Sequence, residues 1–478
     1  MTARRKAIIL VTCCLSLLIV SMDATIVNVA IPSIRSDLSA SASQMQWVID
    51  IYTLVLASLL ILAGASGDRF GRRRVFQTGL AVFALASLLC SLAPNIETLI
   101  AARLLQAIGG SMMNPVALSI VSQIFTGRVE RARALGIWGS VVGIAMSIGP
   151  IVGGLLIETV SWRAVFWINL PICAAALILT AVFVPESKSA TMRNIDPIGQ
   201  ALAVLFLFGI VFALIEGPGL GWTNPLTLTA AAVAVTALMA FLRYESRRRD
   251  PFIDLRFFRS IPFSAATVIA VSAFAAWGAF LFMMSLYLQG ERGYSAMQTG
   301  LIYLPIAIGA LLFSPLSGRL VGRFGARPSL LIAGVLITAA SAMLSFLTTT
   351  TPVWQMLVVF TVFGIGFSMV NAPITNAAVS GMPLERAGAA SAVTSTSRQI
   401  GVSIGVALCG SVAGGALAGT STDFAAAARP LWFVCVGLGV VITVLALSST
   451  SGRALRSADR LAPLIAGDVV TPGVSRAA

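Results

Sequence analysis

The sequence contains no histidine at all. Histidine is the most common general base at neutral pH and a frequent metal ligand, so His-based catalytic triads and His-ligated metal sites are excluded. Any group that carries protons in this protein must then be a carboxylate. The missing residue therefore directs attention to the few acidic side chains.

Charged residues and cysteines are also scarce. Charged residues make up only 10% of the chain and hydrophobic residues 58%, whereas roughly a quarter of a soluble domain is charged. A soluble protein could not cover so much apolar surface with polar groups. The six cysteines all lie in apolar runs, so they form neither a loop-borne disulfide framework nor a metal site, and we expect small buried hydrophobic side chains.

The chain instead contains long apolar runs. A membrane-spanning helix needs about 20 mostly apolar residues, and fourteen runs approach or exceed that length. They lie near residues 7–31, 45–66, 75–94, 98–125, 134–157, 164–184, 197–216, 225–243, 263–285, 299–319, 329–349, 353–379, 388–418 and 430–449. The first run contains Asp23 and lacks a small-residue cleavage site, so we interpret it as a retained helix rather than a signal peptide. We predict an all-α polytopic membrane protein whose partner is the lipid bilayer.

The positive charges give this protein an orientation. The net charge of +14 comes from arginine clusters in alternate loops between the apolar runs, and the opposite loops carry few arginines. Cytoplasmic loops are enriched in Lys and Arg, so we predict that both termini are cytoplasmic and that the protein lies in the cell membrane. A nucleic-acid surface would gather the arginines in one basic domain with aromatic residues, so we predict no nucleic-acid partner.

A charged tight turn occurs twice. Residues 64–74 read GASGDRFGRRR and residues 318–328 read GRLVGRFGARP, with a glycine, the tripeptide Arg-Phe-Gly and a trailing arginine at the same spacing. Such internal repeats are typical of secondary transporters. We predict six-helix bundles at residues 1–184 and 263–449. Two extra helices with cytoplasmic connectors lie between them at 185–262, and a disordered cytoplasmic tail follows at 450–478.

Three ionisable residues lie well inside apolar runs of the first half: Asp23, Asp50 and Arg103. A charge buried in a membrane costs at least ~2.5–3.5 kcal/mol, and such residues are usually paired and functional. A carboxyl group in apolar surroundings favours its protonated form and a nearby arginine opposes this, so a change of neighbours can couple protonation to transport. We predict proton coupling through these residues, with either Asp23 or Asp50 as the main carrier. A structural ion pair, or an Asp50 that reaches interfacial water, is the simpler alternative.

Two motifs indicate moving parts. The fifth run has small residues and a proline that permit close helix approach and a bend, although a plain packing face is the alternative; they are Gly136, Gly149, Pro150, Gly153 and Gly154. In the first charged turn Asp68 does not serve orientation, and it can bind an arginine or a helix N-terminus across the domain interface in one conformation only. We predict a conformational switch there, with a positive-inside anchor as the alternative; its residues are Gly64, Asp68, Arg69, Gly71, Arg72 and Arg73.

Together these residues resemble the major facilitator superfamily, and within it the fourteen-span drug:proton antiporter branch (EmrB/QacA-like). The resemblance is carried by the turn at 64–74 with Ser66 where Leu is usual, and by MDATIVNVAIP at 22–32. It is also carried by ARLLQAIGG at 102–110 and by the run at 136–154, where Ala145 replaces a glycine. It implies fourteen helices arranged 6 + 2 + 6, alternating access, proton coupling through Asp23 and Arg103, and export.

The sequence indicates the substrate less clearly than it indicates the helices and the ionisable residues. We predict that its cavity draws on large apolar residues, although such residues more often serve packing or face lipid; they are Met112, Met113, Trp138, Met146, Trp277, Phe280, Met283 and Phe367. Two intramembrane acids in apolar surroundings suit lipophilic cations, so we expect proton-driven efflux of lipophilic cationic drugs without any cofactor or metal. The alternatives are a dedicated exporter of a neutral or zwitterionic natural product or antibiotic and, far behind it, a polytopic membrane enzyme.

Overall fold

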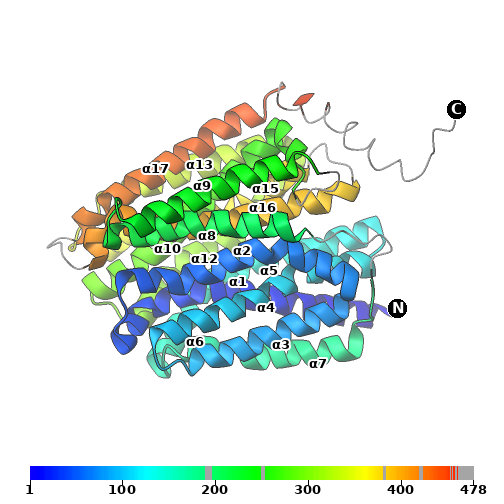
Figure 1. Ribbon diagram of the computed structural model, residues 1–478, viewed down its shortest axis with the longest axis horizontal. Coiled ribbons are helices and arrows are strands. Elements are labelled where there is room, and N and C mark those ends of the chain that lie inside the picture. The colour runs from blue at the N-terminus through cyan, green and yellow to red at the C-terminus, as the bar shows by residue number, and fades with distance from the viewer. Residues whose placement is uncertain are drawn as a thin grey trace.

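We analysed a computed structural model of the chain. It describes residues 1–188, 196–248, 253–379, 384–418 and 424–452, together with 454, 456, 457 and 460. Within this part of the chain every regular element is a helix. The long helices lie side by side in one elongated bundle, and the N-terminus lies at one end of it (Figure 1).

The first half of the bundle is built from seven helical segments. Polar residues define several of its helix starts: Ser41 and Gln44 form a capping box at α2, and the Asn95 side chain accepts from the Thr98 backbone N–H at α4. The segments are α1 (Ala3–Leu38), α2 (Ala42–Phe70), α3 (Arg72–Ser91), α4 (Ile96–Ile124), α5 (Arg128–Thr159), α6 (Ala164–Trp167) and α7 (Asn169–Phe183).

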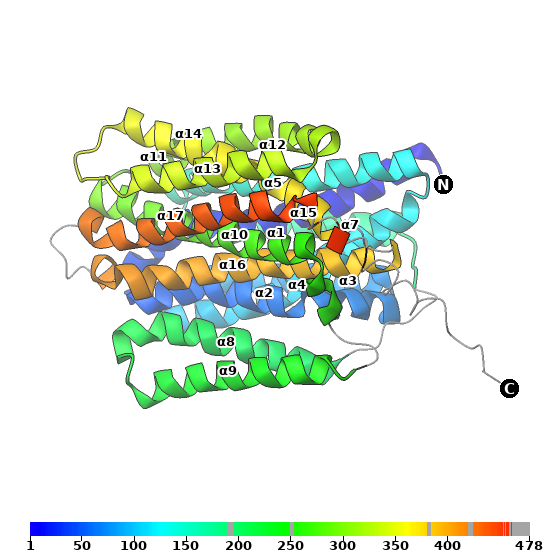
Figure 2. The same cartoon turned by 90° about the horizontal axis from the view of Figure 1, so that it is seen from above.

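Two further helices, α8 (Pro197–Leu220) and α9 (Pro225–Glu245), form a hairpin at the side of the bundle. Each begins with proline at the first helical position, directly after a capping residue, Asp196 or Asn224. Figure 2 shows this pair flanking α2 and α16. Leu207, Val211 and Ile215 of α8 pack there in one buried cluster with residues of both halves.

The second half contains the remaining segments. They are a 3₁₀ turn η1 (Leu255–Arg259), α10 (Ile261–Leu286), a π turn η2 (Tyr287–Glu291), α11 (Ala296–Ile302), α12 (Leu304–Phe324), α13 (Ala326–Leu344), α14 (Val353–Ser368), α15 (Asn371–Val379), α16 (Leu384–Ala418) and α17 (Phe424–Ser449). Helix α10 is buried along most of its length, and it packs against α16 and α17 of its own half and against α1 of the first half.

The length and composition of the helices fit a membrane protein. Among the described residues, eleven helices or helix pairs are long and apolar enough to span a membrane, and α2 makes a twelfth if its two parts, bent by 51° between Leu60 and Leu62, are one span. Helices α5 and α16 lie at the predicted fifth and thirteenth spans. Each includes residues whose side chains the structure does not describe. The predicted tail lies almost entirely outside the described residues.

Candidate functional site

The Asp23 carboxylate lies at the centre of a buried polar network in the first half. Its Oδ2 accepts a hydrogen bond from the Arg103 guanidinium, with which it forms an ion pair. Its Oδ1 accepts from Gln106 Nε2 at 3.0 Å and from Asn169 Nδ2 at 3.1 Å. Both amides also donate to Ser87 Oγ, at 2.9 and 3.3 Å. The network therefore joins four helices: α1, α4 and α7 meet at the carboxylate, and α3 contributes Ser87, which binds the two amides.

The Arg103 side chain donates hydrogen bonds to three residues and lies against an aromatic ring. Its Nε donates to the Val48 carbonyl at 3.1 Å, and its Nη1 donates to Gln106 Oε1 at 2.6 Å as well as to Asp23. The guanidinium carbon lies 4.2 Å from the centre of the Tyr52 ring, a distance at which a cation is attracted to the ring face. Asp23 and Arg103 are both fully buried, so each supplies the counter-charge that the other needs inside the protein.

Asp50 has different surroundings. It is fully buried in α2, where α2 packs against α16 of the other half. Its Oδ1 accepts from Ser403 Oγ of α16 at 3.0 Å, and its Oδ2 has no hydrogen-bond partner. In the described part of the chain no Lys or Arg forms an ion pair with Asp50. A buried carboxylate without a cation is costly, so these surroundings suit the neutral acid.

The structure thus joins two of the three predicted ionisable residues and separates the third. Asp23 pairs with Arg103 inside the first half, whereas Asp50 lies between the halves. No role is predicted from the sequence for Gln106, Asn169 or Ser403. The first two are polar residues inside otherwise apolar runs, and that position is a signal that could have identified them. Ser403 carries no comparable signal, because serine is common in membrane helices.

The small residues of α5 lie between the two halves. Gly149 faces α1, where a Cβ would clash with Thr25 Oγ1, and Gly154 faces α11, where a Cβ would clash with the Ala296 carbonyl. In return, a Cβ on Gly300 would lie 2.7 Å from the Pro150 carbonyl oxygen. These glycines let α5 touch a helix of each half, as small residues do in membranes.

The other residues predicted with this motif are placed as follows. Gly153 also faces α1, because a Cβ there would lie 2.8 Å from Ile26 Cγ1. Gly136 lies outside the residues whose surroundings the structure describes.

Polar contacts join the two halves at the end of the bundle where α1 and α5 end. Glu158 Oε2 at the end of α5 accepts from Ser295 Oγ at 2.6 Å and from the Met297 backbone N–H at 3.1 Å. Nearby, Gln289 Nε2 donates to the Val29 carbonyl at 3.0 Å. The two halves are therefore held together at the end of the bundle away from the N-terminus.

The first charged turn lies at the opposite end. Gly71 adopts φ +113°, a conformation that favours glycine, and separates α2 from α3. Asp68 accepts from Arg72 Nη2 at 2.8 Å, and Arg72 Nη1 donates to Gln123 Oε1 at 3.1 Å. The Arg73 backbone N–H donates to Glu186 Oε1 at 3.2 Å.

All of these partners belong to the first half or to the segment that follows α7. Among the described residues, Asp68 makes no hydrogen bond or ion pair across the interface, and Arg72 of the same turn binds its Oδ1. Gly64 packs against α4, because a Cβ on Gly64 would lie 3.6 Å from Pro115 Cβ. The Arg69 side chain is exposed.

The predicted cavity residues fall into separate clusters. Met112 and Met113 pack where α3 approaches α4, because a Cβ on Gly79 would lie 2.9 Å from Met112 Cβ and 3.2 Å from Met113 Cγ. Trp138 packs with the same core of the first half, and Met146 packs against the larger core that spans both halves.

The other aromatic members, Trp277, Phe280 and Phe367, belong to the second half. Trp277 stacks on Phe367 with ring centres 4.4 Å apart, and Phe280 stacks on Phe363 at 4.3 Å. Met283 is fully buried in the same core. The structure therefore brings Trp277, Phe280 and Phe367 together but places Met112 and Met113 in the other half.

Comparison with known proteins adds the family. The model of the Major Facilitator Superfamily matches residues 13–406 of this chain. The multidrug resistance protein Stp of Mycobacterium tuberculosis is 36% identical over 409 residues, covering 86% of this chain and 76% of Stp. The methylenomycin A resistance protein of Streptomyces coelicolor is 38% identical over 397 residues, 82% of each chain. The tetracenomycin C resistance and export protein of Streptomyces glaucescens is 37% identical over 397 residues, 82% of this chain and 73% of the relative.

These matches cover most of the chain, and the family match includes both charged turns and all three intramembrane ionisable residues. Together with the many apolar helices, they describe a transporter rather than an enzyme, and a multi-pass protein of the cell membrane. The chain belongs to the major facilitator superfamily.

Proposed function

We propose that this protein exports lipophilic, cationic drugs across the cell membrane in exchange for protons. The observation that carries the proposal is the position of Asp50: a fully buried carboxyl group between the two halves, without a cation and with one oxygen unpartnered. Alternating access moves the halves relative to one another, so it changes the surroundings of this group more than those of any group inside one half.

In this scheme Asp50 is the proton carrier. Protonated, it is a neutral acid that fits the apolar seam between α2 and α16. Deprotonated, it is an uncompensated anion that favours a bound cation, because a cation relieves the cost of the buried charge. The proton and the cationic drug therefore compete for one carboxyl group, and this competition couples their movements in opposite directions.

Asp23 and Arg103 have a supporting role in the same scheme. Their network joins α1, α3, α4 and α7, so it keeps the first half rigid while the seam beside it changes. The Arg103 Nε–H bond to the Val48 carbonyl, two residues before Asp50, connects the network to the carrier. A rearrangement of Arg103 would therefore change the hydrogen bonding of the α2 backbone two residues before Asp50.

We further propose the architecture of the fourteen-span branch: six helices, two extra helices and six helices, with both termini in the cytoplasm. The supporting observations are the helices α5 and α16 at the predicted fifth and thirteenth spans, and the charged turns at the N-terminal end of the bundle. The corresponding units are residues 1–184, 185–262, 263–449 and 450–478.

The moving parts follow from this orientation. The α5 glycines and Glu158 form the closed outer gate, and the turn at 64–74 exchanges the partner of Asp68 when the cytoplasmic end closes. The structure then corresponds to a state closed toward the outside.

A dedicated exporter of one natural product is the second candidate. It is favoured by the relatives whose names refer to methylenomycin A and tetracenomycin C. Such a substrate needs no positive charge, so the competition at Asp50 would act through shape and hydrogen bonding rather than through charge.

The test is proton flux in liposomes that contain the purified protein and a pH-sensitive dye. The assay compares lipophilic cations with neutral antibiotics, in the wild type and in Asp50→Asn. Proton movement opposite to a cation, lost in Asp50→Asn, supports the proposal. A response to one neutral compound with silence to cations supports the second candidate. Proton movement in the same direction as the substrate would contradict both.

A further inference from the structure

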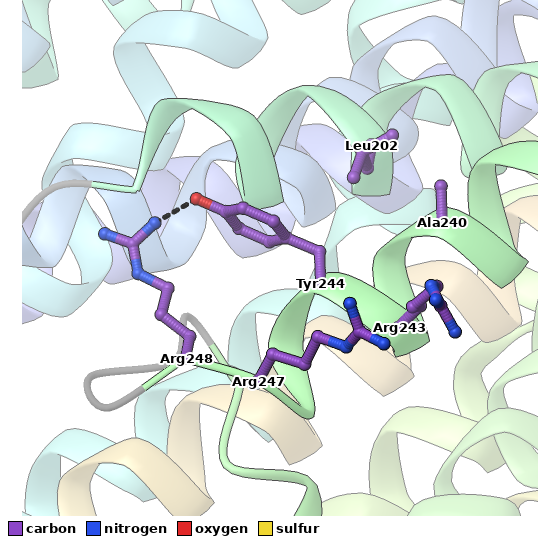
Figure 3. A pocket seen from close by; sticks show the side chains of 6 residues that line it. All are labelled: Leu202, Ala240, Arg243, Tyr244, Arg247 and Arg248. Carbon is purple, nitrogen blue, oxygen red and sulfur yellow. Dashed lines mark hydrogen bonds between the residues drawn. The ribbon is translucent and has the colours of Figure 1, made fainter.

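A pocket opens on the extra pair of helices at the N-terminal end of the bundle. It has a volume of about 540 Å³ and lies between the start of α8 and the end of α9 (Figure 3). Its lining combines three arginines and a tyrosine with two apolar side chains; they are Leu202, Ala240, Arg243, Tyr244, Arg247 and Arg248.

One of the three arginines is already engaged. Arg248 forms an ion pair with the buried Asp196 at 2.8 Å and a hydrogen bond to the Tyr244 hydroxyl, which Figure 3 shows. The Asp196 Oδ1 also accepts from Tyr244 and caps α8 through the Gly199 N–H at 3.0 Å. Asp196 is therefore neutralised by Arg248. A second acid, Glu245, is buried beside Asp196 and accepts a hydrogen bond from the Ile253 backbone N–H at 3.1 Å, so both carboxylates are engaged inside the protein.

Arg243 and Arg247 have no such partner. Both side chains are exposed, and within the described part of the chain neither forms an ion pair or a side-chain hydrogen bond. Arg243 lies in the last turn of α9 and Arg247 lies in the turn that follows the helix, and both line the same pocket. Two positive charges thus remain uncompensated at one opening.

The opposite side of the pocket is apolar and continues along the helices. Beyond Leu202 and Ala240, the neighbouring surface is made by Ile198, Leu205 and Met239, which are 54%, 48% and 64% exposed. Side chains of this kind on a spanning helix face lipid tails. Arg243 lies in the last turn of α9, a helix of 21 residues, which places its charge at the depth of lipid headgroups.

We propose that this pocket binds an anionic phospholipid. Arg243 and Arg247 hold the phosphate of the headgroup, while the acyl chains lie along the apolar surface of α8 and α9. Basic pockets between membrane helices bind acidic headgroups in this manner. A free phosphate would use the two arginines but leave the apolar wall without a partner, so the combination favours a lipid.

The test measures lipid binding to the full-length, detergent-solubilised protein by native mass spectrometry. The probes are dioctanoyl phosphatidylglycerol, dioctanoyl phosphatidylcholine and inorganic phosphate. The Arg243→Gln/Arg247→Gln variant removes the two charges. The matched control is Arg319→Gln/Arg323→Gln, which removes an exposed pair with the same spacing at the same end of α12. A third variant, Arg243→Lys/Arg247→Lys, keeps the charge.

The wild type should bind phosphatidylglycerol in preference to phosphatidylcholine. The glutamine variant at the pocket should bind it about thirtyfold more weakly, because each arginine near a membrane surface contributes about fivefold. The control and the lysine variant should bind nearly as the wild type does. Equal loss in the control, or no loss in the pocket variant, would overturn the proposal. Displacement of the lipid by millimolar phosphate would assign the pocket to the free anion instead.

Discussion

Asp23 and Asp50 are both fully buried acids in neighbouring helices, yet the structure treats them in opposite ways. Asp23 has an arginine and two amides as donors, all from its own half. Asp50 has one serine, from the other half. The difference teaches that burial alone does not define a proton carrier. The two acids differ in their hydrogen-bond partners, and the proposed function assigns the carrier role to Asp50, whose side-chain donor within the described part of the chain comes from the other half.

The strongest way to break this comparison is Asp50→Asn. Asparagine resembles the neutral acid in shape but cannot release a proton, so substrate-driven proton flux should fall at least tenfold while the melting temperature changes little. The measurement is dye-reported flux in liposomes, combined with thermal unfolding in detergent. Glu97→Gln, at an exposed acid in the first turn of α4, serves as the control. Normal flux in Asp50→Asn would remove the carrier role.

The converse substitution, Asp23→Asn, should act first on stability. It leaves the Arg103 charge buried without a counter-ion, and breaking such a pair typically costs about 3–5 kcal/mol. We expect a clearly lower melting temperature, with loss of transport as a consequence. The double variant Asp23→Asn/Arg103→Gln should recover part of the lost stability because it removes the orphan charge. An unchanged melting temperature in the single variant would show that the pair is not structural.

Two glycines of α5 allow contacts within one half to be compared with contacts between the halves, because Gly149 packs against α1 and Gly154 packs against α11. Gly154→Ala forces α5 away from α11 of the other half, and overpacking of this kind costs roughly 1–3 kcal/mol. It should open the closed end and increase thiol labelling of Gln289→Cys about tenfold in a cysteine-free background. Gly149→Ala clashes within the first half only. It should lower the melting temperature without that gain in labelling, and equal labelling in both variants would contradict the assignment.

The smallest effect is expected at the extra pair. Trp47 Nε1, three residues before Asp50, donates to Glu216 Oε1 of α8 at 2.7 Å. Glu216→Gln keeps an acceptor but removes the charge, which should cost about 1 kcal/mol or less. We expect efflux rates to fall by less than about threefold, measured as initial rates in liposomes. A complete loss would mean that α8 takes part in coupling rather than in packing.

The sequence predicted the elements better than their contacts. Apolar length indicated the positions of the helices. Charges inside apolar runs indicated Asp23, Asp50 and Arg103, and only the family resemblance linked Asp23 with Arg103. The bond from Ser403 to Asp50 joins residues 353 positions apart, and no local pattern specifies such a register. The Gln106 and Asn169 amides were visible as polar residues in apolar runs, but only the packing of four helices shows that they meet at one carboxylate.

The closed end of the bundle also sets an energy scale for transport. Glu158 and Gln289 account for three hydrogen bonds between the halves or their linking loops. At about 0.5–1.5 kcal/mol for each bond, opening this end costs roughly 1.5–4.5 kcal/mol in broken polar contacts. One proton that crosses a membrane potential of about 150 mV releases about 3.5 kcal/mol. In the proposed exchange for protons, the polar contacts at this end are thus of the same order as the free energy that one proton supplies.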